Sequence, residues 1–164
     1  MQKIYKSIDL YESSIEHKNY ISETQLEVPL KYFEKYRISS VEEENLNDNL
    51  DELNNFGAFS NNEIENQDHW FLIAISKNNK YYVIQKEEDG KSITYFDDID
   101  EAKNSVRENY HYNDVEFMEE YELNEKINIK DIFDFVKNLP NDYHLIDDNS
   151  QNFVSNILNH YYFK

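Results

Sequence analysis

Two short segments of the chain carry side chains suited to acyl-transfer chemistry. Asp68-His69-Trp70 opens an apolar run, and Asn149-Ser150-Gln151 precedes a helical pattern. A residue at a helix N-terminus lies beside unpaired N–H groups and the positive end of the helix dipole, which favour a thiolate and bind an oxyanion. A histidine at the edge of a neighbouring strand can accept the nucleophile's proton. The pattern therefore predicts His69 as the base and position 150 as the nucleophile.

Position 150 holds serine, and the whole chain has no cysteine. Disulfides and thiolate metal sites are therefore excluded. A serine hydroxyl is far harder to deprotonate than a thiol, so we expect poor activity from this chain as it stands. Two plainer interpretations remain open. Ser150 could be an N-cap, a role that Asp148 or Asn149 could share, and His69 could be an ordinary strand-edge histidine.

The elements that position these residues follow from the hydrophobic pattern. Trp70–Ile75 is a continuous apolar run, typical of a strand buried on both faces. A turn at residues 77–80 leads to a second strand, Tyr81–Lys86. The Asp89-Gly90 pair indicates a hairpin before a third strand, Ser92–Phe96. We therefore predict an antiparallel meander in the centre of the chain.

Helices and further strands are expected around this meander, giving an α+β fold. Residues 1–60 are predicted to form a mostly helical N-terminal extension packed on the core, and residues 61–164 the catalytic-type domain. The expected elements are a short helix over Pro29–Arg37, a helix starting at the Ser40/Glu43 capping box, a helix capped by Asp97 or Asp98, a strand over Val115–Leu123, a helix over Ile129–Leu139, a short strand over Tyr143–Ile146 and a closing helix over Ser150–Tyr162.

The segment Asn149-Ser150-Gln151-Asn152-Phe153-Val154 resembles the Asn-Cys-x-x-Phe box of the lecithin retinol acyltransferase-like proteins. These proteins belong to a wider set of permuted NlpC-like hydrolases with a papain-like fold. His69-Trp70 resembles the family's catalytic His pair, and Tyr143-His144-Leu145 its approach to the nucleophile. The resemblance covers about residues 68–162. It implies a circularly permuted papain-like fold, with an antiparallel sheet packed against helices.

The resemblance also implies an activity, namely hydrolysis or acyl transfer at an amide, isopeptide or ester through an acyl-enzyme, without a metal or other cofactor. Gln85, late on the strand after His69, is the candidate third catalytic residue, with Glu87 in reserve. Candidate substrate-binding residues are Trp70, Asn149 and Gln151. The serine at position 150 departs from the family and indicates either an engineered Cys→Ser change or a natural pseudoenzyme.

The net charge of the chain narrows the classes of molecule that it is expected to bind. Against 16 basic residues there are 34 acidic ones, for a net charge of −18. Such a surface repels phosphates and anionic membranes, which argues against direct nucleic-acid binding and favours a basic protein or peptide substrate. The alternative function is a non-catalytic acidic binding or inhibitor protein, including a nucleic-acid mimic. No apolar stretch is long enough to span a bilayer and no signal peptide is evident, so we expect action in the cytoplasm, or in a host cytosol after delivery as an effector.

Overall fold

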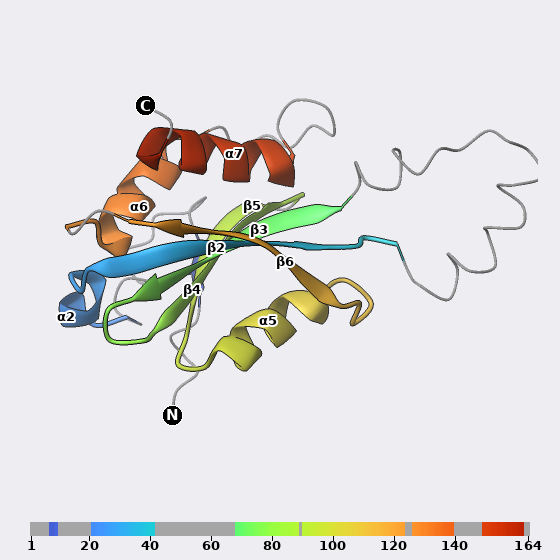
Figure 1. Ribbon diagram of the computed structural model, residues 1–164, viewed down its shortest axis with the longest axis horizontal. Coiled ribbons are helices and arrows are strands. Elements are labelled where there is room, and N and C mark those ends of the chain that lie inside the picture. Colours follow the sequence, from blue (N-terminus) through green and yellow to red (C-terminus); the bar gives the residue numbers. More distant parts are fainter. Residues whose placement is uncertain are drawn as a thin grey trace, which may run out of the picture.

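The computed structural model describes residues 7–9, 21–41, 68–88, 90–123, 126–139 and 149–162. Its strands form one antiparallel sheet in the order β1-β5-β4-β3-β2-β6, with α6 and α7 over one face and α5 over the other (Figure 1). The predicted α+β class is therefore confirmed. The elements are β1 (Ser7–Asp9), α2 (Glu23–Leu26), β2 (Leu30–Ile38), β3 (His69–Ser76), β4 (Tyr81–Glu87), β5 (Gly90–Phe96), α5 (Ile99–Arg107), β6 (Val115–Glu122), α6 (Ile129–Val136) and α7 (Ser150–Tyr161).

The predicted central meander is confirmed as β3, β4 and β5. Asn79 adopts a left-handed conformation (φ 61°) in the turn between β3 and β4, which asparagine tolerates better than most residues. Gly90 has φ 143° where it pairs with Glu87 across the second hairpin, a region that favours glycine. Residues 71–76 of β3 are all buried, as the apolar run predicts for a strand covered on both faces.

The predicted helix over Pro29–Arg37 is wrong, because this segment forms strand β2 between β3 and β6. Proline fits the start of a strand as well as the start of a helix, since its missing N–H leaves no ladder bond unmade there. Pro29 forms an isolated bridge with Asn128 just before the strand begins. The sheet thus contains strands from both sides of the predicted boundary at residue 60. The predicted helix after Ser40 and the predicted strand over Tyr143–Ile146 lie outside the described residues.

The three longer helices begin where capping side chains predict. The Asp98 carboxylate accepts from the Glu101 amide at 3.0 Å, so Asp98 is the cap of α5. Asn128 and Asp131 form a reciprocal capping box at the start of α6. Asn149 caps α7 by accepting from the Asn152 amide at 2.9 Å. No helix in the described part of the chain has the length and apolar character needed to cross a bilayer.

The apolar side chains form one core on each face of the sheet. The larger core lies under α6 and α7 and contains Phe33, Leu72 and Phe153. The smaller core lies under α5 and contains Tyr36, Phe71 and Val106. The sheet is therefore held from both sides, and burial of this apolar surface is the main term that stabilises the fold.

A buried lysine closes the C-terminal end of α6. Lys91, on β5, has only 1% of its surface exposed. Its Nζ donates to the carbonyl oxygens of Val136 at 3.0 Å, Lys137 at 3.4 Å and Leu139 at 2.6 Å. The carbonyls at a helix C-terminus lack partners within the helix and carry its negative dipole end, so a cation is favoured there. The helix predicted over Ile129–Leu139 is shorter in the structure, where α6 ends at Val136.

Candidate functional site

The N-terminus of α7 docks against the start of β3. The Trp70 amide donates to the Ser150 hydroxyl at 3.1 Å, although the two residues are 80 positions apart. One residue further on, the Gln151 carboxamide donates to the Asp68 carbonyl oxygen at 3.1 Å. The β3–β4 ladder begins only at Leu72, which leaves the preceding main chain of β3 open to α7. The structure thus brings together the two segments that the sequence singled out.

Ser150 is the first helical residue of α7, and the capping role belongs to Asn149. The interpretation of Ser150 as a simple N-cap is therefore wrong. The residue is 2% exposed and lies at the helix N-terminus, where unpaired N–H groups and the dipole favour negative charge. No acidic side chain lies in the first turn of α7 to oppose that charge. This position suits an anionic nucleophile.

His69 and Gln85 form a hydrogen bond on the adjacent strands β3 and β4. Nε2 of His69 lies 2.8 Å from Oε1 of Gln85. Because a carboxamide oxygen only accepts, the bond assigns the proton to Nε2 and leaves the lone pair on Nδ1. Gln85 therefore fixes the orientation and tautomer of the ring, which is what a third residue does in a nucleophile–histidine site.

Aromatic rings enclose the imidazole. The Tyr110 ring stacks on His69 with centroids 4.6 Å apart, and the Phe71 ring lies 5.9 Å away. The exposed fraction of His69 is 3%. This burial lowers the pKa of His69 from its ordinary 6.5 to about 4, and the Gln85 hydrogen bond offsets only part of the effect. The imidazole is therefore neutral near pH 7, but it is a weak base.

No hydrogen bond joins Ser150 and His69 in the part of the chain that the structure describes, although a base and its nucleophile should lie close together. The ring stacks on residues of the α5 face, whereas α7 covers the opposite face. The two residues are still neighbours through the main chain. From the 3.1 Å bond to the Trp70 amide, the Ser150 hydroxyl lies within about 5.5 Å of the His69 Cα by standard backbone dimensions. Successive side chains of a strand point to opposite faces, so a direct contact between the His69 ring and the Ser150 hydroxyl would require the start of β3 to turn.

The remaining predicted site residues make structural contacts. Trp70 packs on the larger core, with the Lys35 ammonium 4.8 Å from its ring centroid. The side chains of Asn149 and Gln151 cap α7 and tie it to β3. Glu87, the reserve third residue, instead accepts a hydrogen bond from the Tyr110 hydroxyl at 3.0 Å.

Tyr110 is the neighbour of His69 that the sequence did not indicate. It follows α5, in a segment without regular periodicity, and it contacts the site only because α5 packs on the sheet. Among the described residues, no group of three or more histidine or acidic side chains could hold a metal ion. No protein-family profile, curated protein or solved structure matches the chain.

Proposed function

We propose that the chain is a circularly permuted papain-like domain of the thiol hydrolase or acyltransferase type, with Ser150 at the position of the cysteine nucleophile. The observation that carries this proposal is the joint placement of Ser150 and His69. Ser150 begins a helix beside the strand that bears His69, and Gln85 orients the His69 ring through Nε2. The substrate would be an amide, isopeptide or ester in a basic protein or peptide. The place of action would be the cytoplasm or a host cytosol.

A thiol at position 150 would complete the chemistry. The start of β3 would have to turn the His69 ring towards α7, which would break its bond to Gln85; the imidazole would then take the thiol proton. The N-terminal amides of α7 and the Trp70 amide would stabilise the thiolate. Attack on the substrate carbonyl would expel the leaving group, which takes the proton from His69, and water would then release the acyl group.

With serine in place, the same groups support little turnover. The hydroxyl keeps its proton near neutral pH, and a base whose pKa is about 4 removes it poorly. We therefore expect this chain to be an inactivated Cys→Ser form or a pseudoenzyme. One substitution, Ser150→Cys, tests whether the groups around position 150 still lower the pKa of a thiol there.

The test compares Ser150→Cys with Ser155→Cys, a control that places the only thiol in the middle of the same helix. If the site lowers the thiol pKa from about 8.5 to about 7, iodoacetamide should react about sixfold faster at pH 6 than with the control, after allowing for the lower nucleophilicity of the thiolate. The thiolate's ultraviolet absorbance gives the pKa independently of reagent access. Adding His69→Ala should raise the thiol pKa part of the way back, because the Trp70 amide and the N-terminal amides of α7 remain. A Ser150→Cys thiol that titrates like the control would contradict the proposal.

A non-catalytic acidic binding protein is the second candidate. Its support is the burial of His69, Gln85 and Ser150 together with the net charge of −18. It predicts that Ser150→Cys has an ordinary thiol pKa while the protein still binds a basic partner through its surface. Measuring both properties on the same variant separates the two functions.

A further inference from the structure

Strand β6 lies at one edge of the sheet. It pairs with β2 on one side, and no described strand pairs with its other side (Figure 1). Such an edge presents unpaired N–H and C=O groups that can accept another extended chain. This edge is independent of the Ser150 site and of the function proposed for it.

Most residues of β6 are exposed, and half of them are acidic. Phe117 leaves 52% of its surface exposed, and the strand carries the four glutamates Glu116, Glu119, Glu120 and Glu122. Only Glu116 has an ion-pair partner in the described part of the chain, Arg37 at 3.1 Å. The register of β2 and β6 sets Glu120 opposite Glu34, a like-charge pair that opposes folding. A cationic partner would relieve this repulsion.

The four glutamates of β6 also indicate which kind of partner the edge can bind. A second copy of this edge would add four glutamates to four, which disfavours self-pairing. The register between β2 and β6 also shifts at Met118, which has no partner residue on β2, and such bulges protect edges from self-association. We propose that β6 binds an extended basic segment of a partner protein as an additional strand, with cations over Glu120 and Glu122 and an apolar residue against Phe117.

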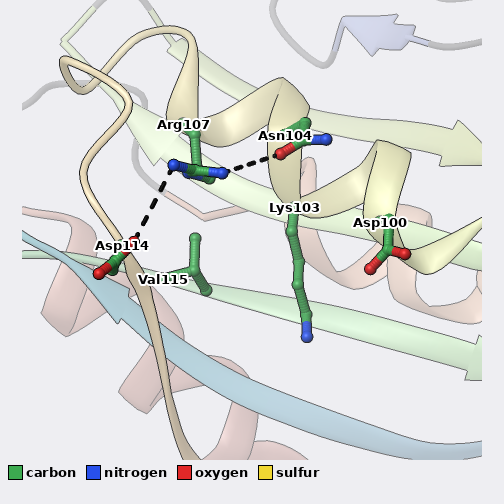
Figure 2. Close-up of a pocket in the computed structure, with 6 residues that line it drawn as sticks. All are labelled: Asp100, Lys103, Asn104, Arg107, Asp114 and Val115. Atoms are coloured by element: carbon green, nitrogen blue, oxygen red, sulfur yellow. Dashed lines mark hydrogen bonds and ion pairs between the residues drawn. The ribbon is translucent and has the colours of Figure 1, made fainter.

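A groove next to the start of β6 would hold the end of that segment nearest Val115. It has a volume of about 610 Å³ and is lined by Asp100, Lys103, Asn104, Arg107, Asp114 and Val115 (Figure 2). Arg107 is committed to the chain itself, because its guanidinium donates to the carbonyls of Tyr112 and Asn113. The Lys103 ammonium lies 5.0 Å from the Tyr36 ring centroid and forms no ion pair with a carboxylate in the described part of the chain. The Lys103 ammonium would therefore repel the cations of a basic segment that enters the groove.

The test uses a labelled synthetic peptide of alternating lysine and valine, with fluorescence anisotropy for affinity and amide chemical shifts for location. The expected result is saturable binding that shifts the amides of β6, weakens with salt and disappears when the peptide backbone is N-methylated. The double variant Glu120→Lys/Glu122→Lys should bind about tenfold more weakly. Glu88→Lys, an exposed glutamate at the distant β4–β5 turn, is the control with the same change of charge per site.

Lys103→Glu provides a test of opposite sign, because it removes the positive charge at the groove and should strengthen binding. Several outcomes would overturn the proposal. These are equal affinity for a peptide with glutamate in place of lysine, shifts confined to other strands, or equal losses in Glu88→Lys and in the double variant. Concentration-dependent dimerisation through β6 without peptide would assign the edge to a second copy of the chain instead.

Discussion

The buried imidazole of His69 makes the stability of the protein depend on pH. The folded pKa is about 4 and the ordinary value is 6.5, so between these pH values the unfolded chain binds a proton that the folded chain does not. Protonation therefore favours unfolding. The full stability is present above about pH 6.5 and is lost as the pH falls towards 4. The gap between the two pKa values corresponds to about 3 kcal/mol.

The assay is urea unfolding at about pH 7.5 and about pH 4.5, for the wild type and for His69→Gln. The glutamine cannot titrate, and its carboxamide can still donate to Gln85. Because the many carboxylates titrate equally in both proteins, the difference between the two pH dependences isolates His69. We expect the wild type to lose about 2.5 kcal/mol more than the variant on acidification.

His111→Gln is the control, since it removes an exposed imidazole and leaves the buried one. Equal acid sensitivity in the wild type and His69→Gln would refute the reasoning, because it would mean that protonated His69 is accommodated in the folded state. A direct nuclear magnetic resonance titration of the His69 ring showing a pKa near 6.5 would refute it as well.

Two further substitutions test the buried residues that hold α7 and α6 against the sheet. Phe153→Ala should destabilise the protein by about 3–5 kcal/mol, because the ring is buried in the larger core. Phe117→Ala, at an exposed ring, is the control and should cost far less. A thermal melt unchanged by Phe153→Ala would show that α7 is peripheral. Lys91→Met should cost about 2–4 kcal/mol in urea unfolding, because three carbonyls at the end of α6 lose a charged donor. Lys130→Met, at an exposed lysine of α6, is the control, and equal costs would contradict the capping role.

The meander and the helix starts could be predicted because their signals are local. A continuous apolar run, an Asp-Gly turn and capping side chains depend on neighbours within a few residues. Strand β2 lacks such a signal. Its buried residues Leu30 and Phe33 belong to one core and Tyr36 and Ile38 to the other, with register shifts along the strand. Burial therefore recurs about every three residues, which imitates a helix.

The candidate site could be predicted in part for the same reason. The proximity of His69 and Gln85 follows from two adjacent strands, and the place of Ser150 follows from a helix start. The stacking of Tyr110 and the depth of His69 depend on how α5 packs against the sheet, which no local pattern encodes. The side of the sheet that each side chain occupies was likewise set by tertiary packing.

The central place of β2 has a consequence for folding during synthesis. The strand leaves the ribosome before either of its neighbours, and its ladder with β6 is complete only after residue 122. At about 5–20 residues per second, the interval from residue 38 to residue 122 is roughly 4–17 s. During this time the meander can form from local contacts, whereas β2 must wait for pairings of long sequence separation. We therefore expect β2 to be the segment of the nascent chain that most needs protection from aggregation.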